Sequence, residues 1–142
     1  MRLSQKTYYA LRSVLELAKH PGSDPVSIAA IAASQQIPPQ FLQVIMRELR
    51  QGGFVDSRRG KEGGYLLARK PSDIPVGEVV RFLEGDFTPV DDQDHGSGED
   101  FPAFTQLWQD ARTALDHVFD TTSFADLIDR ERAASAAGDY VI

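Results

Sequence analysis

The chain has 142 residues, a length suited to one folded domain with a single hydrophobic core and one further element. Hydrophobic residues make up 42% and charged residues 25% of the sequence, as in globular proteins. The absence of cysteine excludes a disulfide framework, a thiolate nucleophile and a thiolate-ligated metal site. The sequence shows no apolar run long enough to span a bilayer and no export leader, so we expect a cytoplasmic protein with no membrane partner.

The net charge of −6 is unevenly distributed along the chain. Residues 1–70 contain eleven basic and five acidic side chains, which gives +6. Residues 71–142 contain four basic and sixteen acidic side chains, which gives −12. Because attraction to phosphate depends on the local field, the first half is compatible with a nucleic-acid partner despite the acidic total.

Two helices are expected in the first 37 residues. The first follows Ser4, a candidate N-cap, and ends near His20. Its predicted apolar stripe consists of Tyr8, Leu11, Leu15 and Ala18. The second is short and follows Ser27, with Ile28, Ile31 and Ala32 facing inward. Residues 34–37 then turn the chain.

A third helix is expected to begin at Pro38 or Pro39 and to end at Gly52 and Gly53. Its inner face has the helical spacing i, i+3, i+4, i+7 and consists of Leu42, Ile45, Met46 and Leu49. Its outer face consists of Gln40, Gln43, Val44 and Arg47. Two helices joined by a tight turn, the second with an exposed polar face, form a helix-turn-helix.

Two short β-like runs follow, residues 54–57 and 65–68. Between them lies a glycine-rich, mostly basic tip, residues 58–64. A helix with a polar outer face followed by a hairpin with a cationic tip is typical of a winged helix-turn-helix that binds DNA.

The second half of the chain is expected to be helical apart from an acidic loop. Residues 76–84 predict a fourth helix that ends at Gly85, and residues 86–100 have the composition of a solvated loop. A long helix begins at about Pro102, and Thr122 or Ser123 caps a last helix whose inner residues are Phe124, Leu127 and Ile128. Residues 133–142 are expected to be a tail.

The long helix has the strongest apolar periodicity in the sequence. Its stripe consists of Phe104, Leu107, Trp108, Ala111, Leu115, Val118 and Phe119. The winged domain can close its own core, so we expect the first helix to cover part of this stripe and the mate in a homodimer to cover the rest. The alternative is packing within one chain only.

The predicted fold is therefore mainly α with a small β-hairpin: a winged helix-turn-helix plus a long C-terminal dimerisation helix. Residues 1–85 form the DNA-binding domain, residues 86–100 the acidic loop, residues 101–132 the dimerisation helices and residues 133–142 the tail.

The sequence resembles the Rrf-two family of winged-helix regulators, the group of bacterial repressors that includes IscR, NsrR and CymR. The resemblance covers residues 1–130, and the Arg-Gly-x-x-Gly-Gly-Tyr motif at residues 59–65 is its most specific part. The other residues that carry it are Met1-Arg2-Leu3-Ser4, Tyr9-Ala10, Ile37, Phe41-Leu42, Leu49-Arg50, Gly53-Phe54-Val55, Ser57, Leu66-Leu67, Val76-Gly77-Glu78-Val79 and Leu107-Trp108. It implies a dimer that inserts the third helix into the major groove and the wing into the minor groove.

Family members that bind an iron–sulfur cluster carry three cysteines before the long helix, and this sequence departs from that pattern. The corresponding places hold Val90, Gly96, Pro102 and Thr105. We therefore expect a member without a cluster or other cofactor. His95 lies among five acidic residues and is a candidate metal ligand, but the spacing matches no defined site and a bare solvated loop is favoured.

The candidate DNA contacts come from three segments. Arg59 resembles the wing arginine that enters a narrow A·T minor groove, and Arg58 and Lys61 are candidate phosphate contacts. Gln40 and Gln43 are candidates for pairing with base edges, and Val44 for contact with a thymine methyl group. The remaining candidate phosphate contacts are Arg2, Lys6, Tyr9 and Arg47. The alternatives are a solvated turn for Arg59, a simple polar helix face for the glutamines and a partly covered apolar position for Val44.

The sequence thus predicts a homodimeric DNA-binding transcriptional regulator, a repressor acting on a palindromic operator with A·T-rich stretches. A small molecule or a partner protein is the expected effector. The alternative is a sensor or protein-interaction module of the same fold with weak or lost DNA binding. An enzyme is disfavoured, because the sequence has no Ser/His/Asp constellation and the glycines near Lys61 lack the Gly-Lys-Ser/Thr ending of a phosphate loop.

Overall fold

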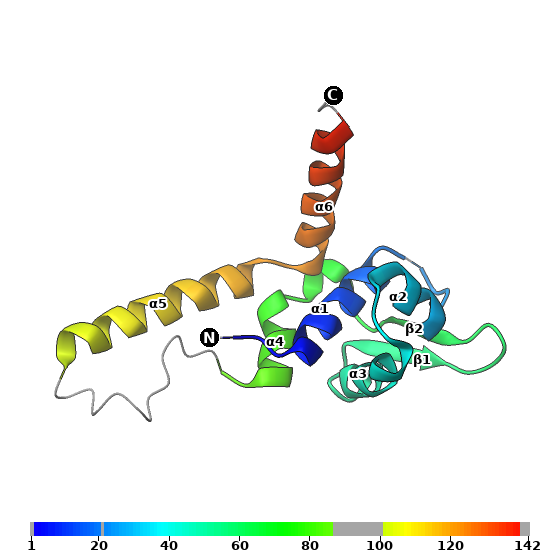
Figure 1. Ribbon diagram of the computed structural model, residues 1–142, viewed down its shortest axis with the longest axis horizontal. Helices are drawn as coiled ribbons and strands as arrows, with labels where there is room; N and C mark the ends of the chain where they lie inside the picture. The colour runs from blue at the N-terminus through cyan, green and yellow to red at the C-terminus, as the bar shows by residue number, and fades with distance from the viewer. Residues whose placement is uncertain (1, 21, 87–100, 140–142) are drawn as a thin grey trace.

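The computed structural model describes residues 2–20, 22–86 and 101–139. The described elements are α1 (Gln5–Ala18), α2 (Ile28–Gln35), α3 (Pro39–Gln51), β1 (Val55–Arg58), β2 (Gly64–Leu67), the 3₁₀ turn η1 (Pro71–Asp73), α4 (Val76–Glu84), α5 (Pro102–Thr121) and α6 (Phe124–Asp139). Helices α1 to α4 and the hairpin form a body, from which α5 and α6 extend in two directions (Figure 1). This arrangement confirms the mainly helical fold with one small hairpin.

Helix α1 crosses the centre of the body and contacts α2, α3, α4, α6 and β2. The predicted Ser4 cap is confirmed, because its hydroxyl accepts a hydrogen bond from the Thr7 amide at 3.2 Å. The predicted stripe is only partly right. Tyr8 is 56% exposed, and the small residues Ala10 and Ser13 are fully buried. Val14 and Leu17 lie on the same buried face, so the inward face of α1 is turned away from the predicted stripe at Tyr8 and shares only Ala18 with it as a fully covered position.

Helices α2 and α3 form the predicted helix-turn-helix. The Ser27 hydroxyl caps α2 by accepting from the Ala30 amide at 3.1 Å. Gln36 ends α2 in the left-handed conformation at φ 55°, which turns the chain into α3. Helix α3 begins at Pro39 without a side-chain cap. Its predicted inner face is confirmed, since Leu42, Ile45, Met46 and Leu49 are all buried.

Strands β1 and β2 form the predicted antiparallel hairpin, displaced by one residue from the predicted ranges. A separate bridge joins Tyr65 of β2 to Val26, with two N–H···O hydrogen bonds of 2.8 Å. Gly64 allows this approach, because a Cβ there would overlap the Val26 carbonyl and lie 2.8 Å from the Ser27 nitrogen. The base of the wing is thereby attached to the start of the helix-turn-helix.

Helix α5 packs against α4, and Leu115 and Phe119 of its stripe lie against the core to which α1 contributes. Arg81 of α4 donates to Asp120 at 2.6 Å and to Asp116 at 3.1 Å. Backbone hydrogen bonds from Val76 to Thr122 and from Phe124 to Ile74 then join the α5–α6 connection to the segment before α4. These salt bridges and backbone hydrogen bonds, together with the apolar stripe, therefore fix the direction in which α5 leaves the body.

Helix α6 begins as predicted and ends later than predicted. Ser123 and Asp126 cap each other, with N···O distances of 2.9 and 3.1 Å. The helix runs to Asp139, so residues 133–139 are not the expected tail. Four alanines among residues 133–138 explain the extension, because alanine has the highest helix propensity.

The core is formed by α1 to α4, β1 and Phe124 of α6. Within the described ranges, no helix has both the length and the apolarity required to cross a membrane.

Candidate nucleic-acid interface

Helix α3 presents the predicted outer face to solvent. Gln40, Gln43 and Arg47 are exposed, and Val44 is 51% exposed. These side chains share one side of the helix, and the residues of the opposite side are buried in the core. The exposed face can therefore enter a groove without any change in the fold.

The direction of α3 is set by its contacts with α1 and with the turn before it. The Arg12 guanidinium of α1 donates to the carbonyl of Gln35, the last residue of α2. Gln35 in turn donates from its side chain to Glu16 at 2.8 Å. Two side chains of α1 therefore hold the residue that precedes the turn into α3.

Glu16 is a buried carboxylate with several partners. Burial alone raises its pKa, but hydrogen bonds from Gln35, Ser34 and His20 and the charge of Lys19 outweigh that effect, so the pKa lies below its usual value of 4.5. Lys19 also pairs with Glu131 of α6 at 2.8 Å. Charged groups thus connect α6, α1 and the helix-turn-helix.

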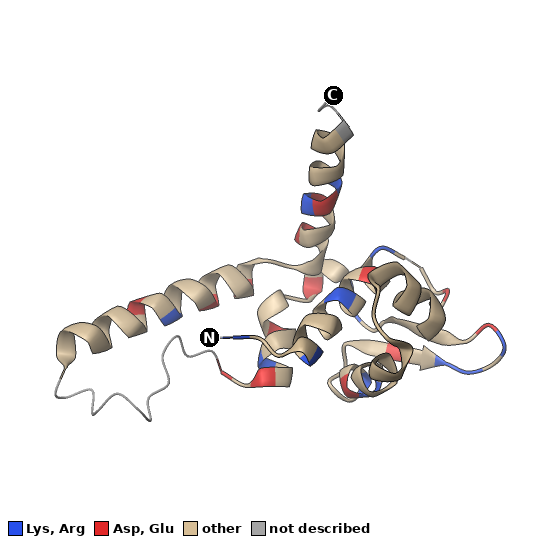
Figure 2. Ribbon diagram, viewed as in Figure 1, with Lys and Arg blue, Asp and Glu red and all other residues tan. Residues whose placement is uncertain are grey.

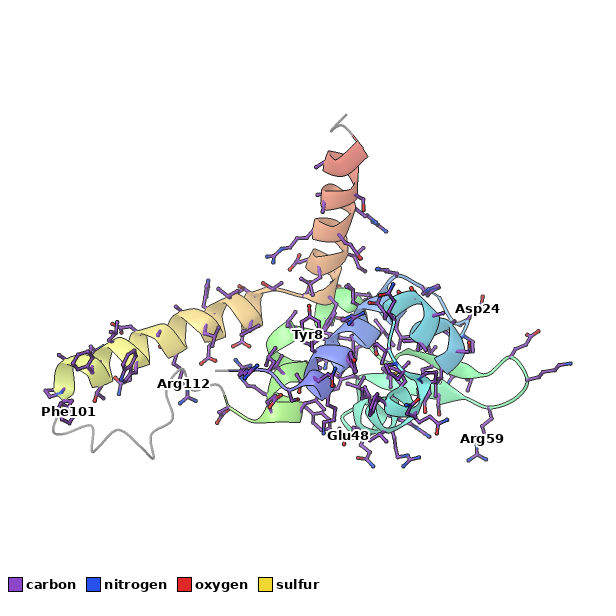
Figure 3. The ribbon with its side chains drawn as sticks, viewed as in Figure 1. Tyr8, Asp24, Glu48, Arg59, Phe101 and Arg112 are labelled. Carbon is purple, nitrogen blue, oxygen red and sulfur yellow. The ribbon has the colours of Figure 1, made fainter. Side chains whose placement is uncertain are left out.

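The wing presents its three predicted cations to solvent. Arg58, Arg59 and Lys61 are exposed, and the turn is closed by a hydrogen bond from the Gly63 amide to the Gly60 carbonyl at 3.0 Å. Arg59 leaves the tip toward the same side of the view as α3 (Figure 3). The wing and the outer face of α3 are thus available to one ligand.

The start of α1 supplies the last predicted contacts. Arg2 and Lys6 are exposed, although Lys6 pairs with Glu48 of α3 at 3.1 Å. Tyr9 is half-buried and its hydroxyl accepts from Gln5 at 2.9 Å. Together with α3 and the wing, these residues place basic side chains on the body, whereas acidic residues predominate on α5 and α6 (Figure 2).

Phe41 and Arg50 are exposed residues of α3 that were not among the predicted contacts. Phe41 is 50% exposed, and its ring lies 6.4 Å from the Tyr9 ring, centroid to centroid. Helical periodicity could have predicted that Phe41 is exposed, because residue 41 falls outside the i, i+3, i+4, i+7 positions of the buried face.

The predicted dimerisation stripe on α5 divides into two parts. Phe104, Leu107 and Val118 are at least half exposed and Trp108 is 38% exposed, whereas Leu115 and Phe119 pack partly against the protein's own core. Ala111 is exposed between them. Phe101, also exposed, marks the end of α5 farthest from the body (Figure 3). The outer half of the stripe has no cover within the described chain.

The candidate metal ligand His95 lies outside the described residues, as does most of the predicted acidic loop. Among the described residues, no group of three or more His, Asp or Glu side chains could hold a metal ion. The sequence as a whole contains no thiolate, so its residues do not fit the cysteine-ligated cluster that some family members carry.

Comparison with known proteins identifies the family. Residues 3–130 match the family model described as "Rrf2: Iron-dependent Transcriptional regulator". The chain belongs to the Rrf2 family. The resemblance seen in the sequence is thereby confirmed over the winged domain, α5 and the start of α6.

Individual members of the Rrf2 family are similar along most of their length. The HTH-type transcriptional regulator CymR of Bacillus subtilis is 36% identical over 127 residues, which cover 89% of each chain. The regulator Rv1287 of Mycobacterium tuberculosis H37Rv is 38% identical over 149 aligned positions, covering 99% of this chain and 91% of Rv1287.

Solved structures of the family have the same fold. The structure of B. subtilis CymR, described as the global cysteine regulator of that organism, matches with a TM-score of 0.81 at 35% identity, covering 92% of this chain and 98% of CymR. The IscR structure from T. potens matches with a TM-score of 0.76 at 32% identity, covering 94% and 90%. This Rrf2 protein is accordingly a winged helix-turn-helix transcriptional regulator that binds DNA.

Proposed function

We propose that this regulator acts as a homodimeric repressor, with α3 in the major groove and the wing in the adjacent minor groove of each operator half-site. The observation that carries the proposal is that the outer face of α3 is exposed and that Arg59 leaves the wing toward the side of the view on which α3 lies (Figure 3). An α-helix fits the major groove, and an arginine fits the narrow minor groove of an A·T tract, where the negative potential is greatest.

The uncovered stripe of α5 supports a two-fold dimer. A helix of 20 residues is about 30 Å long, and its outer half exposes Phe104, Leu107 and Trp108. Pairing with the same helix of a second copy removes these side chains from water and relates the two α3 helices by a two-fold axis. The proposed operator is therefore palindromic, with half-site centres about one helical turn, or a multiple of it, apart.

We further propose that the protein works in the cytoplasm without a cluster, and that a small molecule or a partner protein supplies the signal. The donor set supports the first part, because cluster assembly uses thiolates and the chain has none.

The first prediction concerns Arg59. A duplex selected by the protein from a random-sequence library serves as the operator probe, and affinity is measured by fluorescence anisotropy across a salt series. We expect affinity to fall steeply with salt, with a slope of about −0.9 for each phosphate contact. Arg59→Ala should weaken binding by roughly 1–3 kcal/mol, because the wing loses its minor-groove cation.

Arg130→Ala is the matched control, since Arg130 is exposed on α6, away from the proposed interface, and the substitution removes the same charge. It should leave affinity nearly unchanged. Failure to select any duplex at low salt would favour the interaction module, and equal losses in the two variants would remove the wing from the mechanism.

A further inference from the structure

Helix α3 carries two exposed apolar side chains on its outer face, Phe41 and Val44. They are 50% and 51% exposed, whereas the apolar residues of the inner face are at most 2% exposed. Their neighbours on the outer face are glutamines and Arg47. Each exposed apolar group costs free energy in water, so an apolar pair in this position indicates a ligand surface that is itself partly apolar.

The two side chains are neighbours on the helix surface. Residues three apart on a helix lie next to each other, so Phe41 and Val44 form one apolar edge of the outer face. At 100° per residue, Gln43 falls on the opposite edge. The first half of the outer face therefore has an apolar edge, which lies beside α1 and ends at Glu48, and a polar edge on the other side.

The Phe41 ring is held in place by α1. It lies 6.4 Å from the Tyr9 ring, and the Arg12 guanidinium lies 5.8 Å from the centroids of both Tyr9 and Tyr8. Arg12 is itself anchored to the Gln35 carbonyl. These neighbours restrict the rotamers of Phe41 before any ligand binds. The Phe41 side chain therefore loses less conformational entropy when a ligand binds.

We propose that Phe41 and Val44 make this regulator select thymine, by packing against thymine 5-methyl groups on the floor of the major groove. The inference rests on the proposed insertion of α3 into that groove. The 5-methyl group of thymine is the apolar feature that distinguishes the four base pairs there, and phenylalanine is a side chain suited to it. The exposed Arg47, three residues after Val44, favours a nucleic acid over a second protein as the occupant of this face.

The test removes methyl groups from the DNA and apolar groups from the protein. In the duplex selected by the wild-type protein, each thymine is replaced in turn by deoxyuridine, which lacks only the 5-methyl group. At one or more positions in each half-site we expect wild-type affinity to fall about fourfold, the effect of exposing one buried methyl-sized group. At those positions Phe41→Ala or Val44→Ala should bind the thymine and uracil duplexes with nearly equal affinity.

Three further variants keep the test independent of folding defects. Phe41→Leu retains an apolar side chain and should keep part of the thymine preference. Val44→Thr has the shape of valine and retains one methyl group, so it should also keep part of the preference at its own position, whereas Val44→Asn, which retains none, should lose it. Phe82→Ala is the matched control, because Phe82 is 46% exposed on α4 and should leave the full preference intact. Circular dichroism and the melting temperature establish that each variant is folded.

The outcomes are distinct. A thymine preference that persists unchanged in the Phe41 and Val44 variants would assign it to DNA shape and overturn the inference. Insensitivity of wild-type binding to every thymine-to-uracil change would overturn it too, while leaving operator binding itself established. Absence of any selected duplex would overturn the proposed function and the thymine assignment together.

Discussion

Glu16 is a charged residue in a buried position between α1 and the end of α2. Its carboxylate is 2.8 Å from the Gln35 amide nitrogen and 3.2 Å from His20 Nε2, and its side chain is 8% exposed. A buried charge of this kind destabilises the fold unless its hydrogen bonds are made. Here the bonds hold Gln35, the last residue of α2, so the stability of the fold and the position of the turn into α3 depend on the same carboxylate.

The second prediction is a pH-dependent effect of Glu16→Gln. Because the pKa of Glu16 is lowered in the folded state, its charge stabilises the fold fully above the usual value of 4.5, and this contribution is lost as the pH falls through the lower, folded-state pKa. The variant should have a free energy of unfolding lower by about 1–2 kcal/mol at pH 7. The difference should shrink below pH 4.5, as measured by urea unfolding.

Glu131→Gln provides the control, because Glu131 is exposed and contributes only a surface ion pair to Lys19. Its effect at pH 7 should be below about 1 kcal/mol. A Glu16→Gln penalty of constant size from pH 7 to pH 3 would show that shape, and not charge, accounts for the loss.

The wing depends on its attachment to the segment before α2. The hairpin has only four residues in each strand, and an isolated hairpin of this size is marginal in water. The additional bridge between Tyr65 and Val26, and the packing of Val55 in the core, orient it relative to α3. The distance between the wing tip and α3 therefore depends on the Val26–Tyr65 bridge and on the packing of Val55.

The third prediction concerns Gly64, which lies beside the Val26–Tyr65 bridge. Gly64→Ala places a methyl group against the Val26 carbonyl, which is backbone and cannot rotate away. We expect stability to fall by about 2 kcal/mol or more and the melting temperature by roughly 5 °C or more. Operator affinity should fall as well, because the wing is displaced.

Gly138→Ala is the matched substitution, since no heavy atom lies within 4 Å of the added carbon and the residue is helical. It should leave the melting temperature unchanged or slightly raised. Equal melting temperatures for the two variants would mean that the Val26–Tyr65 bridge contributes little to the wing.

The whole molecule separates basic and acidic surfaces. Basic residues outnumber acidic ones on α1, α3 and the wing, and acidic residues predominate along α5 and α6 (Figure 2). In the proposed dimer the acidic helices are turned away from the phosphates, which orients the protein on DNA before contact. The overall charge of −6 is thus compatible with DNA binding because basic residues predominate on the elements proposed to contact DNA.

The fourth prediction concerns the dimer. Leu107→Asp places a charge on the exposed apolar stripe of α5, which should convert the protein to a monomer in sedimentation velocity experiments. Binding to a palindromic duplex should fall by far more than binding to one half-site. The melting temperature of the monomer should still report a folded winged domain, since Leu107 lies outside the core.

Gln109→Asp is the control on the same helix. Gln109 is exposed and lies well away from the stripe at helical spacing, so the added charge should leave the dimer intact. A dimeric Leu107→Asp variant would place the dimer interface elsewhere on the molecule.

Local patterns in the sequence were sufficient to predict the elements that carry the interface. The inner face of α3 is readable because a helix repeats every 3.6 residues, whatever surrounds it. The hairpin follows from two short strands around a glycine-rich tip, and the serine caps follow from hydrogen bonds within a few residues. These features depend on near neighbours in the chain, and the structure confirms them at Ser4, Ser27 and residues 39–51.

Only the tertiary structure determined which face of each helix is buried and which element packs against it. Tyr8 is exposed because α1 turns Ala10, Val14 and Leu17 toward its neighbours. Helix α5 follows α4 because Arg81 meets Asp116 and Asp120, 35 and 39 residues away. Periodicity shows that a face is apolar, but its partner is chosen by contacts between residues distant in the chain, and these become definite only when the helices pack together.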